Sequence, residues 1–191
     1  MTSTPSVTPP PQGGTQEATL AGGCFWCIES AFNQLRGVVH AESGYSNGQH
    51  PSPTYEDVCT GRTGHAEVVR VRFDPSVVSY RQLLEVFFTL HDPTTLNRQG
   101  NDVGTQYRSA VFTHDEAQAQ TAREVIDALT RDGVFEHPIV TEVQPVASYH
   151  PAEDYHQGYA LRNPHQGYCA FVVAPKLQKF RKTHKALLKQ A

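Results

Sequence analysis

Two cysteines at a predicted turn between a strand and a helix are the residues best suited to chemistry. Hydrophobic spacing predicts a strand over residues 17–22 and a helix over residues 24–36, with glycines between them that allow a sharp turn. Cys24 then stands at the helix start, where free backbone N–H groups and the helix dipole stabilise an anion. This position predicts a lowered pKa for the Cys24 thiol and a nucleophilic thiolate. The alternative is that Cys24 is a small buried residue, the commonest state of a free cysteine.

The two aromatic residues after Cys24 have two possible roles. Phe25 and Trp26 either fill the core, as aromatics at a helix start usually do, or form an apolar wall beside the thiolate. Such a wall would suit a methyl group.

Glu67 is the carboxylate of greatest interest. It falls within an alternating strand predicted for residues 65–73, where an ionised carboxylate is costly to bury. A buried glutamate with a raised pKa is a ready proton donor. Other polar residues could join it, although each alone is explained equally well as an ordinary hydrogen-bonded residue. These are Tyr55, His65, Asp102 and Tyr107.

The elements that must position these residues alternate between strand and helix. Ser79 and Gln82 form a capping-box signature for a helix that ends near residue 90. Further strands are predicted over residues 38–45, 108–113 and 139–146, with an amphipathic helix over residues 115–131. After Pro151 the order loosens into a short helical piece, a coil over residues 163–169 and a basic end. We therefore expect an α/β (α+β) two-layer sandwich, with helices over a mixed sheet and a long C-terminal coil around the core.

Length and composition favour one domain. Residues 1–16 are rich in Pro, Thr, Ser and Gly and predict a disordered tail, which leaves a single catalytic domain over residues 17–191. A net charge of -3 with interleaved signs gives no basic stripe for nucleic acid. The chain has no apolar run of bilayer length and no signal-peptide pattern. We expect a soluble, cytoplasmic monomer with no membrane partner.

Three long motifs follow one another in the chain. They are GCFW at residues 23–26, YEDVCTG through GHAE at residues 55–67, and HDPTT through GNDVGTQYRS at residues 91–109. In this order they resemble the peptide-methionine (S)-S-oxide reductases, the methionine sulfoxide reductase A family. A further match, EDYHQ at residues 153–157, extends the resemblance to nearly all of the chain after the N-terminal segment. The resemblance implies a repair enzyme that reduces the S epimer of methionine sulfoxide, free or in oxidised proteins.

The resemblance also implies a role for each candidate residue. Cys24 attacks the sulfoxide sulfur and becomes a sulfenic acid. The S–O bond breaks readily only if its oxygen gains a proton or hydrogen bonds during the attack. The other implied residues bind and orient the substrate. Phe25 and Trp26 hold the methyl group, Glu67, Tyr55 and Tyr107 bond the oxygen, and Asp102 and His156 support them. No bound cofactor or metal is implied, and the reductant is thioredoxin, or dithiothreitol in the laboratory.

Regeneration of Cys24 needs a second thiol, for which Cys169 is the favoured candidate. Cys27 lies at i+3 on the predicted helix, where Cβ atoms are about 5–6 Å apart, wider than a disulfide prefers. Cys27 remains the alternative, because dithiol motifs at helix starts do close in thioredoxin-like proteins. Cys59 is expected to be buried, whereas the predicted coil over residues 163–169 would let Cys169 swing toward Cys24.

The sequence departs from the family pattern in two places that concern this second thiol. Many family members carry another recycling cysteine near the C-terminus, but residues 170–191 contain none. The segment NPHQGYC at residues 163–169 is one residue longer than the commonest family pattern.

Two rival classes could use the same cysteines. A thioredoxin-like dithiol oxidoreductase also carries Cys-x-x-Cys at a strand-to-helix turn. A zinc-binding module could use Cys24, Cys27 and two other ligands, but structural zinc sites usually show a second close ligand pair, and this chain has one such pair. Methionine sulfoxide reduction, insulin disulfide reduction and stoichiometric zinc binding distinguish the three classes.

Overall fold

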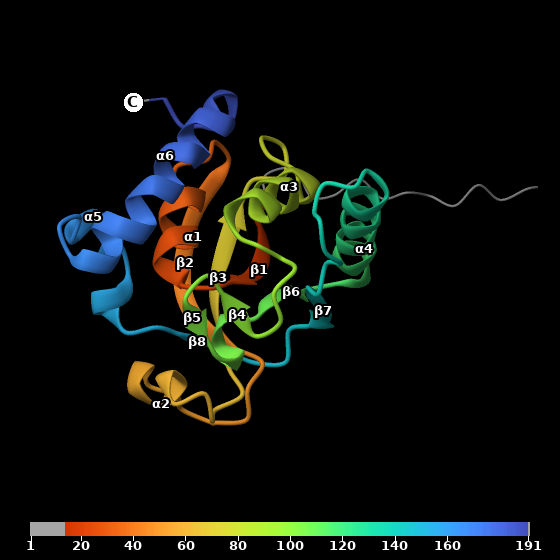
Figure 1. Cartoon of the computed structure of the whole chain (residues 1–191). Helices are drawn as coiled ribbons and strands as arrows, with labels where there is room; N and C mark the ends of the chain where they lie inside the picture. Colours follow the sequence, from red (N-terminus) through yellow and green to blue (C-terminus); the bar gives the residue numbers. More distant parts are fainter. Residues whose placement is uncertain (1–13, 191) are drawn as a thin grey trace, which may run out of the picture.

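A six-stranded mixed sheet organises the chain in a computed structural model that describes residues 14–190 (Figure 1). The strand order is β7-β6-β1-β3-β2-β8, and neighbouring strands are antiparallel except for the parallel pair β6 and β7. The sheet strands are β1 (Gln16–Gly22), β2 (Val38–Ser46), β3 (Ala66–Phe73), β6 (Ser109–Thr113), β7 (Glu142–Pro145) and β8 (Tyr149–Pro151). A separate hairpin pairs β4 (Arg98–Gln99) with β5 (Asp102–Val103).

Helices cover one face of this sheet. They are α1 (Phe25–Phe32), α2 (Tyr55–Cys59), α3 (Tyr80–Leu90), α4 (Glu116–Arg131), α5 (Tyr159–Arg162) and α6 (Ala174–Thr183). Helix α1 packs on β1, β2 and β3, with α5 and α6 beside it, whereas α4 packs on β6 and β7 (Figure 1). The predicted sandwich of helices over a mixed sheet is therefore confirmed.

Alternation along β3 decides which side chains face the helices. Val69, Val71 and Phe73 belong to the main core, whereas Ala66 and Val68 belong to a smaller cluster on the opposite face. Glu67 is two residues before Val69 and therefore points toward the helices. The strand period alone thus carries this carboxylate beneath α1.

Local sequence signals account for several helix boundaries. Ser79 accepts from the backbone N–H of Gln82 and Gln82 bonds back to Ser79, which confirms the predicted capping box at the start of α3. Helix α1 is shorter than its predicted range and ends at Phe32. Helix α2, a five-residue helix capped by Thr54, was not predicted.

The C-terminal segment covers the core as predicted, but it is more helical than the predicted coil. A π-helical turn over Cys169–Val173 continues directly into α6. Cys169, Val173, Leu177 and Phe180 are all buried, and their spacing of three or four residues forms one helical stripe. Burial of this stripe against α1 explains why the segment folds as a helix.

The predicted tail lies mostly outside the described residues. Strand β1 begins at Gln16, one residue within the predicted tail, and the boundary between tail and domain stays a prediction. Between residues 14 and 190, no helix combines the length and apolar character needed to cross a bilayer.

Candidate active site

The turn between β1 and α1 places Cys24 as the N-cap residue of the helix. Gly23 has φ +91°, and a Cβ at this position would lie 2.6 Å from Cγ of Gln99. The amide of Gln99 is fixed in turn, because it accepts from the backbone N–H of Asp92 and donates to its carbonyl, both at 3.0 Å. A glycine is therefore required where the turn passes the β4–β5 hairpin.

The predicted lowering of the Cys24 pKa is wrong for the protein without substrate. Burial, followed by the charge of Glu67, raises the pKa of this thiol well above its usual value. A hydrogen bond from the backbone N–H of Trp26 acts in the opposite direction but is outweighed. The helix start favours a thiolate as predicted, yet the sequence could not show that a carboxylate shares the same enclosed space.

Glu67 lies beneath the helix start in a nearly closed environment. Its side chain is 2% exposed, and its Oε1 accepts the backbone N–H of Phe25 at 3.2 Å. Burial raises the pKa of Glu67 to about 8, so the carboxyl is largely protonated at neutral pH. The expected buried glutamate is therefore present, directly beside the residue that follows Cys24.

The aromatic residues after Cys24 pack differently from each other. Phe25 is buried, with its ring 5.7 Å from that of Tyr45 and 5.1 Å from that of His156. Trp26 is half-buried and stacks on Tyr159 at 4.0 Å, and its indole N–H donates to Nδ1 of His156 at 3.0 Å. Phe25 thus belongs to the core, while Trp26 presents part of its ring to the surface.

His156 is enclosed by aromatic rings. It is fully buried, and burial lowers its pKa, so the imidazole is neutral. Since Nδ1 accepts from Trp26, the proton is on Nε2, which has no hydrogen-bond partner among the described residues. The ring of Tyr55 lies 4.4 Å from this imidazole.

Two tyrosine hydroxyls gather near Glu67. Burial, followed by the charge of Glu67, raises the pKa of both Tyr55 and Tyr107, which keeps them protonated and able to donate. Cys59, one helical turn along α2, contributes further to the raised pKa of Tyr55. The expectation that Cys59 is buried is wrong, because α2 exposes this cysteine at its C-terminal end.

Asp102 and His65 have separate supporting roles. Asp102 is half-buried on β5 and accepts the Tyr168 hydroxyl at 2.6 Å, which joins the hairpin to the C-terminal segment. Its charge also acts on Cys24. His65 is buried, accepts from the backbone N–H of Gly48 at 2.9 Å and bonds the carbonyl of His50 at 2.8 Å. It braces the loop between β2 and β3.

The four cysteines are free thiols, and Cys169 does not lie in a coil. It is 2% exposed at the first position of the π-helical turn. The charge of Cys169 acts on Cys27, whose pKa is raised to about 11 by burial, whereas Lys176 acts to lower it. Charges from Glu67, Cys27 and Asp102 act on the Cys24 thiol. Cys169 and Cys27 both belong to the main core, and Cys27 is one turn along α1 from Cys24.

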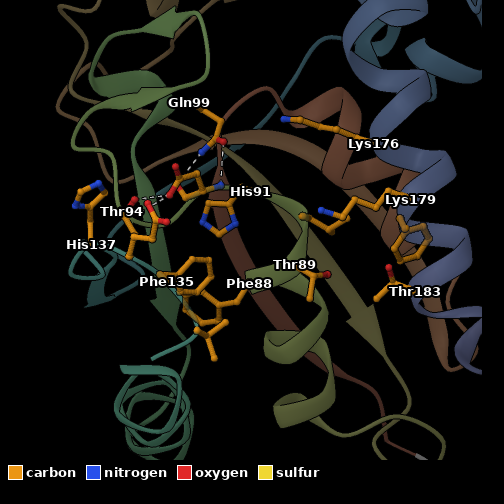
Figure 2. A pocket seen from close by; sticks show the side chains of 15 residues that line it. Phe88, Thr89, His91, Thr94, Gln99, Phe135, His137, Lys176, Lys179 and Thr183 are labelled. Atoms are coloured by element: carbon orange, nitrogen blue, oxygen red, sulfur yellow. Dashed lines mark hydrogen bonds between the residues drawn. The ribbon is translucent and has the colours of Figure 1, made fainter. Parts of the chain in front are cut away.

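A pocket of about 660 Å³ is lined by Gln99 on one side and by none of the predicted site residues (Figure 2). It runs between α3, the segment after α4, and α6, with Lys176 and Lys179 on one wall and Phe135 and His137 on the other. Gln99 is its connection to the site, because this side chain lines the pocket and also packs against Gly23. Within residues 14–190, no group of three or more His, Cys, Asp or Glu side chains is arranged to hold a metal ion.

Sequence reasoning missed three residues of this site, Tyr45, Glu153 and Tyr168. Tyr168 bonds Asp102, and Glu153 bonds both the hydroxyl of Tyr45 and the backbone N–H of Tyr55. Glu153 and Tyr168 occurred in recognised motifs, but their partners are far away in the chain and no local spacing marks them. Together Cys24, Glu67, Tyr55 and Tyr107 offer a thiol, a largely protonated carboxyl and two hydroxyl donors, which suits the transfer of an oxygen atom to sulfur.

Comparisons with known proteins agree with this chemistry. The family model described as "Peptide methionine sulfoxide reductase" matches residues 16–188. A protein of Polynucleobacter asymbioticus named "Peptide methionine sulfoxide reductase MsrA" is 56% identical over 173 residues, which cover 91% of this chain and 91% of that protein.

Solved structures give the same comparison in three dimensions. The reduced form of Mxr1 from Saccharomyces cerevisiae has a TM-score of 0.76 and 37% identity, over 81% of this chain and 89% of that one. A structure of Mxr1 in complex with Trx2 has a TM-score of 0.55 and 25% identity, over 81% of this chain and 91% of that one.

Proposed function

The chain belongs to the peptide methionine sulfoxide reductase family, and we propose that it reduces the S epimer of methionine sulfoxide, free or in proteins, at Cys24. The observation that carries the proposal is the protonated carboxyl of Glu67, which accepts the N–H of Phe25 at the start of the helix that bears Cys24. A nucleophile and a proton donor thus meet at one point.

The proposed chemical step transfers one oxygen atom. The Cys24 sulfur attacks the sulfoxide sulfur while Glu67, Tyr55 and Tyr107 bond the oxygen, and the Glu67 proton moves onto it as negative charge develops. The attack forms a bond between the two sulfur atoms. This S–S bond and the S–O bond of the sulfoxide then break while the oxygen bonds to the Cys24 sulfur, so Cys24 is oxidised by two electrons to a sulfenic acid and the sulfoxide is reduced to the sulfide. The thiol proton lost from Cys24 returns Glu67 to its protonated form.

Substrate orientation follows from the positions of the donors and the aromatic rings. The partly exposed face of Trp26 supplies an apolar surface for the methyl group, next to the buried Phe25. With the methyl group on this side and the oxygen toward Glu67, the sulfur presents one face to Cys24. One epimer alone satisfies all three contacts.

Regeneration is proposed to use Cys169. Its thiol condenses with the Cys24 sulfenic acid, which releases water and forms a disulfide that an external dithiol then reduces. Thioredoxin is the proposed reductant, and the structure of the relative Mxr1 in complex with Trx2 supports this choice. No bound cofactor is needed for this cycle. A cytoplasmic location and a monomeric state stay predictions.

The test is an assay of the purified protein on the separated S and R epimers of methionine sulfoxide, with dithiothreitol or thioredoxin as reductant. We expect turnover of the S epimer alone, with no turnover by Cys24→Ser, because an alcohol has no comparable nucleophilic anion. Equal rates on both epimers would contradict the proposed orientation. Turnover by Cys24→Ser would remove Cys24 from the mechanism, and insulin disulfide reduction without sulfoxide reduction would favour the thioredoxin-like rival.

A further inference from the structure

Helix α2 carries Tyr55 in a long connection between β2 and β3 and lies at one end of the molecule (Figure 1). Thr54 and Asp57 form a capping box that uses the backbone N–H groups of Thr54 and Asp57. The N–H of Tyr55, the first residue of the helix, is one of the groups that a helix cannot satisfy internally. It donates to Oε2 of Glu153 at 3.0 Å, a contact between residues 98 positions apart.

The second oxygen of the same carboxylate reaches the sheet. Oε1 of Glu153 accepts the hydroxyl of Tyr45 at 3.0 Å. Tyr45 is fully buried on β2, and its partner in the β2–β3 ladder is Glu67. The Glu153 carboxylate therefore links Tyr45, which pairs with Glu67 in the sheet, to the backbone N–H of Tyr55.

The state of Glu153 suits this role. Burial alone would raise its pKa, but hydrogen bonds from the backbone and from the Tyr45 hydroxyl lower the pKa below its usual value. The Tyr155 hydroxyl adds a further donor to Oε2 at 3.3 Å. Hydrogen bonds to an ionised carboxylate are about twice as strong as those between neutral groups.

From these contacts we infer that Glu153 is a positioning residue that fixes the Tyr55 hydroxyl relative to Glu67. The inference rests on the proposed function, in which both groups bond the sulfoxide oxygen. Helix α2 has five residues, too few to hold its own position, so an anchor from the sheet decides where the Tyr55 ring lies. Displacement of a donor by about 1 Å is enough to slow a reaction by up to about a hundredfold.

The experiment is a double-mutant cycle on single-turnover reduction of the S epimer by the prereduced enzyme, with methionine as the measured product. We expect Glu153→Gln to slow the step by about tenfold and Tyr55→Phe by at least about tenfold. The double variant should match Tyr55→Phe within about twofold, because a misplaced ring matters only while it carries its hydroxyl. If Glu153→Gln caused a general loss of structure, the double variant would instead react more slowly than Tyr55→Phe alone.

Glu42→Gln is the matched control. Glu42 lies on β2 and, like Glu153, accepts a tyrosine hydroxyl, that of Tyr149, but this pair belongs to the opposite face of the sheet. Its rate should stay within about twofold of wild type. If Glu153→Gln does not fold, Tyr45→Phe replaces it in the cycle, since it removes only the hydroxyl that holds Oε1.

The outcomes separate the inference from the function beneath it. Additive losses in the double variant, or a wild-type rate in Glu153→Gln, would overturn the positioning role while the reductase assignment stands. Absence of sulfoxide reduction by the wild-type enzyme would overturn the proposed function and the inference with it.

Discussion

Cys24 is half-buried and Glu67 is buried near it, and the raised pKa values of the thiol and the carboxyl favour their uncharged forms at neutral pH. Burial raises the pKa of Glu67 to about 8, and burial with the Glu67 charge raises that of Cys24. Two neighbouring anions in a low-dielectric site would repel each other strongly. The uncharged pair avoids this cost, and a proton on Glu67 is available when the sulfoxide oxygen develops charge. In the proposed mechanism, substrate therefore activates the thiol, which is not activated beforehand.

Replacement of Glu67 by Gln tests this proton transfer. Gln keeps the acceptor for the Phe25 N–H but cannot give up a proton, so the single-turnover rate should fall by about a hundredfold or more. In the wild type the protonated form is the active one, so the rate contribution of Glu67 should fall as pH rises through about 8. The variant should lack this decline. Wild-type single-turnover rates in Glu67→Gln would remove the carboxyl from the mechanism.

Sequence reasoning at this scale succeeded where a local pattern carried the information. The alternating pattern correctly predicted that Glu67 lies on a strand, and the helix start predicted where Cys24 would lie. The pKa of Cys24 was predicted wrongly because burial and the charge of Glu67 raise it. Both depend on the folded structure, and Glu67 lies on a strand more than forty residues away in the chain. The exposure of Cys59 depends on α2, which the sequence did not indicate.

Among the elements, the turn before α1 and the β4–β5 hairpin are fitted to each other. Gly23 passes the Gln99 side chain at a distance that leaves no room for a Cβ. Gln99 is held by the Asp92 backbone, so it cannot move aside freely. The hairpin also carries Asp102, which accepts the hydroxyl of Tyr168, the residue before Cys169. The position of Cys24 therefore depends on contact with two short strands, β4 and β5, for which the sequence shows no strand signal.

Gly23→Ala should be more harmful than an alanine at another left-handed glycine. The backbone conformation at φ +91° costs a residue with a Cβ about 1 kcal/mol, and the contact with Gln99 adds to this cost. Gly133→Ala is the control, because Gly133 has φ +63° and a Cβ added there would meet no atom within 4 Å. Urea unfolding should show a larger loss for Gly23→Ala, together with lower activity. Equal losses would show that Gln99 yields without cost.

The helical segment that begins at Cys169 affects the proposed regeneration of Cys24. Cys169 begins a π-helical turn and is buried, so its proposed reaction with Cys24 does not have the freedom of the predicted coil. The spacing of buried residues from Cys169 to Phe180 is visible in the sequence, but the preceding Pro and Gly concealed it.

We predict that one equivalent of substrate yields a Cys24–Cys169 disulfide, detected by peptide mass spectrometry. Cys169→Ser should keep one turnover per enzyme but lose most thioredoxin-linked turnover, because the sulfenic acid on Cys24 then has no resolving thiol. Cys59→Ser is the control, since Cys59 is exposed on α2 and has no part in the proposed cycle. A Cys24–Cys27 bridge, or full thioredoxin-linked turnover in Cys169→Ser, would instead assign resolution to Cys27.

Across the whole molecule, the sheet brings together residues that are distant in sequence. Cys24 follows β1, Glu67 lies on β3, Asp102 on the hairpin, and His156 after β8. The alternation of strands and helices was sufficient to predict the layers, because each element carries its own period. The strand order was not predictable, since it depends on long-range pairing such as that of β1 with both β3 and β6.

Buried ionisable groups from several elements set the pH dependence of folding. Burial raises the pKa of Glu29 from 4.5 to about 7 and that of Glu67 from 4.5 to about 8, so the folded state binds more protons than the unfolded state in this range. Their contribution to stability is complete below pH 4.5 and is lost as pH rises toward 8. Burial of His91 has the opposite effect below pH 6.5, because its pKa is lowered to about 4. Stability should therefore decline from about pH 6.5 to 8, where the two glutamates dominate.

Glu29→Gln isolates one part of this decline. Glu29 is 2% exposed on α1 and accepts the backbone N–H of Gly158 at 2.8 Å, a bond that the amide oxygen of Gln can keep. At about pH 8 the wild type must bury an anion and the variant does not, so the variant should be more stable by on the order of 2 kcal/mol. At about pH 4 Glu29 is mostly protonated in both the folded and the unfolded state, and the difference should nearly vanish. Urea unfolding at the two pH values measures this, with the exposed Glu85→Gln on α3 as a control that should show no such change. If the variant is equally or less stable than wild type at the higher pH, the Glu29 anion is well stabilised in the folded protein. The bond between Glu29 and Gly158 would then not weaken as pH rises.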